Sequence, residues 1–449
     1  MIARKSDENM VTFAVEAALA AGATAAEGFL IRSSSTTVEV SEGKVENVKV
    51  RDGSGIGARV LAGERLGFAH TSDLSDSGIE RAARDAVTNA ESGFPDPYNQ
   101  LPAPAGEYPE IERFDPELAD VGLEERIELA MLMEASARSY DKRIAKVRQS
   151  TVSDSSSDVH LANSRGISLW NKGTFCSASL LAVAEEDGEA QMGWDFGHSL
   201  YFRALRVEPI GKNAARRAVD LLGAKQVETT TVPVILDSPV ASEFLAAVGH
   251  ALMADQVQKH KSLFAGKIGE KVASTSVTIV DDGAFERGIA PSPADGEGVV
   301  SQRTVLIESG ILRRFLHNTY TAGKDAVEST GNGVRFSYAA LPEVGASNFY
   351  LVPGKVTRAE LVEGCSRGYL VTDVMGMHTV DMVSGDFSVG ASGLWIESGK
   401  AKFPVRETTI AGNVKDILVE IEAVADDLGF YSRYGSPTIL IGNVVVSGK

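Results

Sequence analysis

The side chains best suited to metal or nucleophilic chemistry are sparse and scattered in this chain of 449 residues. Its seven histidines are His70, His160, His198, His250, His260, His317 and His378. No two of them have the i,i+3 or i,i+4 spacing that paired helical zinc ligands usually have, and none lies near a cysteine. The histidines therefore indicate no zinc site built from neighbouring residues.

Three other patterns could carry chemistry. Met377–Asp381 could supply His378 and Asp381 as ligands, but a solvated loop is the simpler interpretation. Gly53–Gly57 lacks the G-x-G-x-x-G spacing, a following helix and a Walker lysine, so it predicts a β-turn rather than a phosphate loop. A Ser-His-Asp triad stays open on composition alone.

The most informative segment is a predicted helix from Ser238 to His260. Its apolar side chains recur at helical spacing and form one stripe: Phe244, Leu245, Val248, Leu252 and Val257. The run Ala247–His250 matches the end of the H-E-A-V-G-H motif, and the segment resembles the zinc helix of TldD metallopeptidases. Where that motif has its first histidine and its glutamate, this chain has Leu245 and Ala246.

These two replacements remove the chemistry of the motif. A zinc peptidase needs paired imidazoles to hold the ion and an adjacent carboxylate as general base. His250 alone can do neither, so we expect it to be a hydrogen-bonded core or cleft histidine rather than a metal ligand. Leu245 is expected to pack where a ligand would otherwise project.

Composition and charge exclude several classes of protein. The formal net charge of -17 argues against a surface that binds nucleic acid, because such affinity comes largely from Lys and Arg. No stretch approaches the roughly 20 apolar residues of a membrane span, and Ala18–Ala26 is too weakly apolar for a signal sequence. Cys176 and Cys365 lie far apart, which indicates reduced thiols. We therefore expect a cytoplasmic protein with neither nucleic-acid nor membrane partners.

The N-terminal half, residues 1–228, is predicted to be an α/β domain made of two similar halves. The two halves cover about residues 1–92 and 117–224. The pattern of each half predicts a helix, several strands with glycine turns, and a second helix. The strands of the first half are expected to be short, over residues 28–32, 37–41, 45–51, 55–61 and 65–70. A Pro-rich connector over residues 93–116 predicts a linker or a strap along the surface.

Residues 229–449 predict a second domain of different character. Many short strands separated by Gly-rich turns indicate a mostly antiparallel, β-rich domain, and the Ser238–His260 helix is its one prominent helix. A further helix is expected over residues 414–428, with Ile417, Leu418 and Ile421 on its apolar side. The whole chain is therefore predicted to belong to the α+β class.

Several separated motifs, in the same order along almost the whole chain, make it similar to the PmbA (TldE) branch of the TldD/PmbA family. They are Arg51–Gly57, Leu306–Gly310, Arg367–Gly376, Gly385–Gly393, Thr408–Asp416 and Gly442–Gly448. The resemblance implies that residues 229–449 form a metallopeptidase-like domain.

The resemblance also implies a second missing part of the zinc site. TldD-like subunits bind zinc through both histidines of the H-E-x-x-x-H helix and a cysteine in a C-terminal loop. Here Ala425–Leu428 runs through Gly429–Tyr434 almost directly into Gly435–Thr438, where catalytic relatives carry a longer insertion with the cysteine. We therefore expect no catalytic residue, metal or cofactor in this chain, and we expect zinc in a partner subunit.

The implied role is that of the non-catalytic subunit of a TldD/TldE-type heterodimer that cleaves unfolded peptides. Two alternatives stay open: a homodimeric peptide-binding protein without catalysis, and an autonomous metallopeptidase with unrecognised ligands. The partner would be a TldD-like catalytic subunit, or a second copy of the chain. The candidate substrate-binding residues are His250, His317, Asn318, Tyr320 and Asn332.

Overall fold

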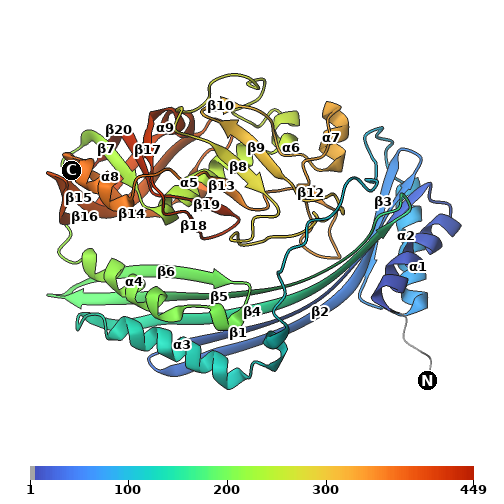
Figure 1. The fold of residues 1–449 in the computed structure, drawn as a ribbon, viewed down its shortest axis with the longest axis horizontal. Helices are drawn as coiled ribbons and strands as arrows, with labels where there is room; N and C mark the ends of the chain where they lie inside the picture. The colour runs from blue at the N-terminus through green and yellow to red at the C-terminus, as the bar shows by residue number, and fades with distance from the viewer. Residues whose placement is uncertain (1–5) are drawn as a thin grey trace.

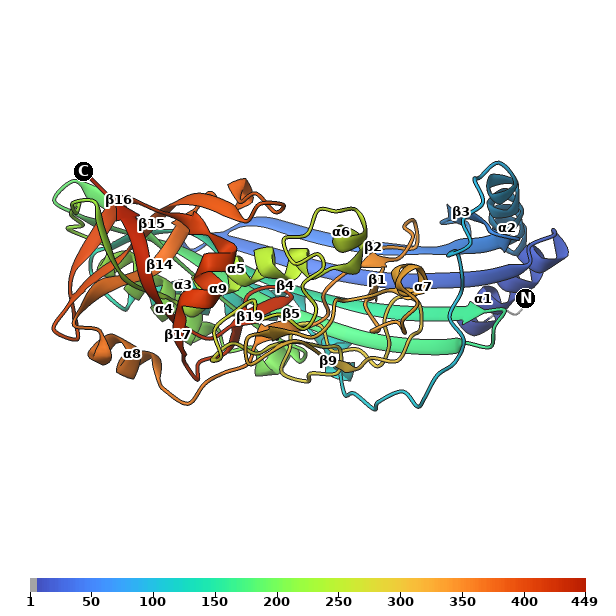
Figure 2. The same cartoon turned by 90° about the horizontal axis from the view of Figure 1, so that it is seen from above.

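The computed structural model describes residues 6–449, so the N-terminal residues 1–5 lie outside the described part. Figure 1 shows a long curved sheet made by the N-terminal half and, above it, a β-rich body made by the C-terminal half. Figure 2 shows the long strands running beneath that body and extending past it toward α1 (Asp7–Ala20) and α2 (Asp76–Glu91). The predicted fold class is confirmed, with a helix–sheet region followed by a mostly β domain.

The N-terminal half contains two copies of the same series of elements: a helix, three strands and a second helix. The first copy consists of α1, β1 (Ala25–Ser41), β2 (Lys44–Ala62), β3 (Arg65–Thr71) and α2. The second copy consists of α3 (Leu123–Arg138), β4 (Ile144–Asn163), β5 (Ser168–Glu186), β6 (Glu189–Ser199) and α4 (Val207–Asp220). Two short 3-10 helices flank the second copy, η1 (Pro116–Asp120) and η2 (Phe202–Ala204).

The two copies join into a single antiparallel sheet. Its strand order is β3-β2-β1-β4-β5-β6, and β1 pairs with β4 from Glu27 opposite Asn163 to Val40 opposite Ser150. Helices cover only one face of the sheet, and each buries an apolar stripe against it. In α2 the stripe is Ile79, Ala83 and Val87, each at most 5% exposed. The other face of the sheet is therefore free to meet the C-terminal body.

The strands are far longer than predicted. The pairs of short strands expected in the first copy are continuous in β1 and β2, and the β-turn expected at Gly53–Gly57 is wrong because that segment lies inside β2. Gly43 and Gly63 do form the turns, with φ of 67° and 62°. Gly55 serves a different purpose: a Cβ there would lie 2.4 Å from the ring of Tyr338, so its absence lets the C-terminal half approach the sheet.

The C-terminal half is built from two further six-stranded sheets. One has the order β16-β15-β14-β7-β20-β17 and the other β10-β9-β8-β13-β19-β18. The strands of the first are β7 (Thr230–Leu236), β14 (Arg367–Met375), β15 (Asp386–Glu397), β16 (Lys400–Asn413), β17 (Ile421–Val424) and β20 (Ile439–Ser447). Those of the second are β8 (Ile279–Asp282), β9 (Arg303–Glu308), β10 (Ile311–Leu312), β13 (Phe349–Leu351), β18 (Gly429–Phe430) and β19 (Tyr434–Ser436).

The remaining elements of this half are short, apart from one helix packed into its core. A two-stranded sheet pairs β11 (Gly333–Val334) with β12 (Glu343–Val344). The helices are α5 (Ser238–Ala251), α6 (Ala254–Gln258), α7 (Thr319–Asp325), α8 (Arg358–Gly364), α9 (Val414–Glu420) and the 3-10 helix η3 (Met377–Thr379). Side chains of α5 belong to one continuous apolar core together with strands of both large sheets.

Two helices predicted in this half are shorter than expected. The helix over Ser238–His260 is divided into α5 and α6, because the backbone of Leu252 and Ala254 hydrogen-bonds with Leu316 instead of continuing the helix. The helix expected over residues 414–428 ends at Glu420. Ile421 is extended and pairs with Ile441 of β20, because a neighbouring strand is available to a β-branched residue there.

Within residues 6–449, the helices are all too short or too polar to cross a bilayer.

Candidate functional site

The first part of the site is α5, where the sequence resembles a zinc helix. Leu245 is 5% exposed and faces a small apolar cavity of about 20 Å³. That cavity is lined with apolar side chains of α9 and β17 and of strands of both sheets, among them Ile417, Leu418, Ile421, Ile279 and Ile439. The position of the motif's first histidine is therefore part of the hydrophobic core.

The rest of the motif does not gather ligands either. Ala246 and His250 are half-buried, and His250 lies in the last turn of α5. Gly249 abuts Tyr434 of β19, since a Cβ there would lie 2.4 Å from Cε1 of that ring. Within residues 6–449, no three His, Cys, Asp or Glu side chains are grouped so that they could hold a metal ion. The residues around α5 therefore do not fit a zinc ion.

A side chain closes the connection after β17, the segment where the family resemblance implies that a loop with a third ligand is missing. Asp427 accepts hydrogen bonds from the backbone N–H of Thr438 (2.8 Å) and from its hydroxyl (2.7 Å). Only β18 and β19 intervene between Val424 and Ile439. This carboxylate therefore ties the start of the connection to its end.

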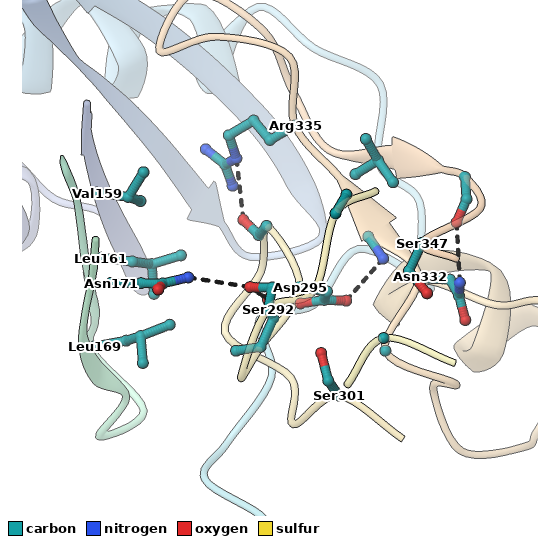
Figure 3. A pocket seen from close by; sticks show the side chains of 18 of the residues that line it. Val159, Leu161, Leu169, Asn171, Ser292, Asp295, Ser301, Asn332, Arg335 and Ser347 are labelled. Carbon is teal, nitrogen blue, oxygen red and sulfur yellow. Dashed lines mark hydrogen bonds between the residues drawn. The ribbon is translucent and has the colours of Figure 1, made fainter. Parts of the chain in front are cut away.

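The second part of the site is a cavity between the N-terminal sheet and the loops of the C-terminal half (Figure 3). Its volume is about 260 Å³. Apolar side chains of the sheet form one wall: Phe29, Ile31, Val159, Leu161 and Leu169. Polar groups and glycines of C-terminal loops form the other, and Asn171 of β5 donates a hydrogen bond across the gap to Ser292 (3.0 Å). The cavity thus lies where the two halves of the molecule meet.

A buried cluster of four charges joins the two halves beside this cavity. Arg59 of β2 lies 2.7 Å from Glu27 of β1 and 2.7 Å from Glu297 of the C-terminal half, and Arg335 of that half also pairs with Glu27. Their side chains are at most 6% exposed. Although burial opposes ionisation, Arg335 and Arg59 hold the pKa of Glu27 below its usual range. The cluster is therefore a compensated set of charges.

Asp295 lies in the wall of the same cavity and is not compensated in this way. Burial and the neighbouring charge of Glu297 raise its pKa from 3.8 to about 7, while three backbone N–H groups favour the ionised form. These donors are Glu297 (2.9 Å), Val299 (2.9 Å) and Gly333 (2.7 Å). The charge of Asp295 is thus expected to change near neutral pH.

Of the five candidate substrate-binding residues, Asn332 alone lies in the lining of this cavity. Its side-chain amide donates to Asp281 (2.7 Å) and its oxygen accepts from Thr330 (2.7 Å), which holds the Gly331–Gly333 turn in place. Asn318 instead caps the N-terminus of α7, with its side chain accepting from the N–H of Thr321 (2.9 Å).

The other candidates lie apart from the cavity lining. Tyr320 donates its hydroxyl to Asp96 of the Pro-rich connector (2.8 Å), and burial together with that carboxylate raises the pKa of Tyr320 to about 12. His317 is buried, and its Nδ1 has no hydrogen-bond partner within the described residues. His250 stays on α5. The structure therefore does not unite the five residues into one site.

Four charged residues of the cavity were missed from the sequence: Arg113, Asp295, Arg335 and Arg433. Each lies in an irregular segment, and no spacing of charges there marks a site. The only available signal was the glycine-rich surroundings of Asn332, since glycines often mark close approach of backbone.

The absence of a G-x-S-x-G elbow, expected for the triad that composition leaves open, is wrong at the level of sequence, because Gly364–Gly368 has this spacing. A nucleophile elbow turns from a strand into a helix. Here the order is reversed, since α8 ends at Gly364 and β14 begins at Arg367, and Ser366 between them is exposed. The segment therefore lacks the context that such a nucleophile needs.

Comparisons with known proteins identify the same family in the N-terminal and C-terminal halves of the chain. Three family models of the PmbA/TldA metallopeptidases match: domain 1 at residues 26–90, the central domain at 116–222 and the C-terminal domain at 229–448. A Metalloprotease PmbA homolog of Haemophilus influenzae is 31% identical, over 98% of this chain and 95% of its own length.

Solved structures show the same similarity. The structure of TldE from Thermococcus kodakarensis has a TM-score of 0.89 and 27% identity, covering 98% of this chain and 99% of that one. A protein described as a putative modulator of a DNA gyrase, from Thermotoga maritima, has a TM-score of 0.92 and 25% identity, covering 98% of this chain and 100% of that one.

Proposed function

Because this chain belongs to the PmbA/TldE branch of the TldD/PmbA metallopeptidase family, we propose that it is the non-catalytic subunit of a TldD/TldE-type peptidase complex. The observation that carries the proposal is the position of Leu245. A side chain 5% exposed in an apolar core has replaced the first zinc ligand, and the half-buried Ala246 has replaced the general base.

The proposal assigns the zinc ion and the cleavage step to a TldD-like partner. This chain would supply part of the chamber that receives unfolded peptides. Its long sheet supports that role, because the helices cover only one of its faces and the other faces the C-terminal body. The net charge of -17 would bias such a chamber against acidic peptide segments.

The decisive experiment compares the chain alone with the chain co-expressed with a TldD-like chain from the same source. We expect a stable heterodimer by size-exclusion chromatography with light scattering, with zinc and peptidase activity that depend on the partner. An interface of an obligate pair should bury more than about 2,000 Å².

Two outcomes would contradict the proposal. A homodimer that ignores the TldD-like chain at micromolar concentration would favour a peptide-binding protein without catalysis. One zinc per isolated chain, together with peptidase activity that a chelator abolishes, would favour an autonomous metallopeptidase.

A further inference from the structure

Arg113 is an arginine held in a defined position by the Pro-rich connector. Its carbonyl oxygen accepts a hydrogen bond from the N–H of Thr174 in β5 (2.8 Å), and the N–H of Asp115 donates to the hydroxyl of the same threonine (2.8 Å). The guanidinium lies against Gly173, where a Cβ would be only 2.3 Å from Nη2. The glycine therefore makes room for the guanidinium.

The charge of Arg113 is not compensated by a carboxylate. Among residues 6–449 it forms no ion pair, and its buried Nε has no hydrogen-bond acceptor. Burial, and to a smaller extent the charge of Arg433, lower the pKa of Arg113 to about 10, so the group stays positive at neutral pH. Arg113 is half-buried, and a partly desolvated cation without a carboxylate partner gains from contact with an anion.

Two more arginines complete this surface. Arg433 is exposed at the edge of the cavity, and it donates only to the carbonyl of Ala346 (3.0 Å). Asp281 is the carboxylate that interacts electrostatically with Arg433. Its oxygens already accept hydrogen bonds from Asn332 and Ser347. Arg335, with a side chain 1% exposed, has an unpartnered Nη1 and lies over the ring of Phe29 at 4.4 Å.

The arginines lie where two cavities meet. Beside the cavity of about 260 Å³ is a second one of about 380 Å³, and both are lined by Arg113, Ser157, Ala290 and Arg433. The second cavity is the more open of the two, so a ligand has a route to Arg113 and Arg433. On the inner side the ligand would meet the apolar wall of the sheet described above.

We propose that this pair of cavities binds the carboxylate of a short peptide between Arg113 and Arg433, with an adjacent apolar side chain against the sheet wall. Guanidinium groups bind carboxylates through paired, charge-assisted hydrogen bonds. Nη1 of Arg335 offers one more donor, to a carbonyl oxygen of the same peptide. The site is separate from α5 and does not require a partner subunit.

The charges around the cavity favour a carboxylate over a phosphate group. Asp281, Asp295 and Glu297 are all close to the site, and they repel a ligand in proportion to its negative charge. A carboxylate carries one negative charge, whereas phosphate groups carry about 1.5 to 2 at neutral pH. The carboxylate is either the C-terminus of a peptide or an acidic side chain, and the probes below distinguish the two.

Isothermal titration calorimetry of the full chain, which measures the affinity for four probes, tests the proposal. The probes are acetyl-Ala-Leu with a free carboxylate, the same dipeptide as its amide, acetyl-Glu-Leu amide, and inorganic phosphate. We expect binding of at least one carboxylate peptide about 10- to 100-fold tighter than binding of the neutral amide. The better of the two carboxylate peptides identifies the source of the group.

Two variants and a control locate the binding. Arg113→Gln should weaken carboxylate binding about 10- to 100-fold. Gly173→Ala keeps every charge but displaces the guanidinium, so it should also weaken binding. Arg84→Gln changes the net charge as Arg113→Gln does, but on an exposed side chain of α2, and should leave binding unchanged.

Three results would each overturn the proposal. The first is equal affinity for the free acids and the neutral amide, and the second is phosphate binding at least as tightly as the carboxylate peptides. The third is equal binding by the Arg113→Gln and Arg84→Gln variants. If Arg113→Gln fails to fold, the Gly173→Ala variant and the wild-type probe series decide. These measurements use the isolated chain, so they are independent of whether it pairs with a catalytic subunit.

Discussion

Two buried regions of this protein differ in polarity: the surroundings of Leu245 in α5 are apolar, whereas the boundary between the two halves contains buried ion pairs. At α5 the positions of a zinc ligand and a general base are occupied by Leu245 and Ala246, and Leu245 contributes to a continuous apolar core. At the boundary between the two halves, Glu27, Arg59 and Glu297 remain almost fully buried and paired.

The two regions gain stability in different ways. At α5 the buried leucine stabilises the core by removing apolar surface from water. Buried charges are different, because removing one partner leaves the other uncompensated. The charged boundary is therefore expected to tolerate the loss of a single charge poorly.

The largest effect is expected at the charged boundary. Arg59→Met leaves Glu27 and Glu297, with side chains 0% and 1% exposed, without this shared partner. The free energy of unfolding should fall by about 3–5 kcal/mol. Urea denaturation measures it, and Arg84→Met is the control because its ion pair with Glu80 is exposed and contributes about 0–1 kcal/mol. Equal losses in the two variants would show that the boundary is no more sensitive than the surface.

A somewhat smaller effect is expected from restoring the zinc motif in α5. Leu245→His with Ala246→Glu should lower the free energy of unfolding by about 2–4 kcal/mol, because the histidine replaces a buried leucine among apolar neighbours. No robust zinc-dependent turnover should appear, because the loop that carries the third ligand in relatives is absent. Ala246→Glu alone is the control, since Ala246 is only half-buried. Zinc-dependent cleavage by the double variant would contradict our interpretation of the C-terminal turn.

The smallest effect depends on pH and concerns Asp295. Since its pKa rises from 3.8 to about 7 on folding, ionisation opposes folding: the penalty is absent below about pH 4, grows as pH rises, and is complete above about pH 7. Glu297 is the facing carboxylate, and the backbone N–H groups of Glu297, Val299 and Gly333 face the same oxygens.

Asp295→Asn removes this penalty. Between pH 4 and pH 8, the stability of the variant relative to the wild type should therefore improve by about 1–3 kcal/mol. Denaturation at the two pH values measures the change, with the exposed Asp85→Asn as control. A relative stability that does not change with pH would show that Asp295 is ionised at little cost.

Local patterns predicted much of the fold. The helical spacing of Ile79, Ala83 and Val87 predicts a helix over residues 76–90, and α2 ends one residue later at Glu91. Helical periodicity depends on neighbouring residues only. Gly43 and Gly63 likewise predicted turns between strands, and both form turns in the structure. The extended state of Gly53–Gly57 was not predicted, because it depends on pairing with β1, in which Gly55 lies opposite Ile31.

The sequence by itself determined that the zinc motif lacks its first histidine and its glutamate, since residue identity alone decides which atoms can bind a metal. It also determined the repeated order of helices and strands. Only the tertiary structure decided where charge is left uncompensated. Arg113, Arg335 and Arg433 come from three distant segments, and their burial and pairing depend on how the sheet and the C-terminal loops close on each other. Long-range packing of this kind leaves no spacing in the sequence, because any loop of suitable length can bring such a residue to the same place.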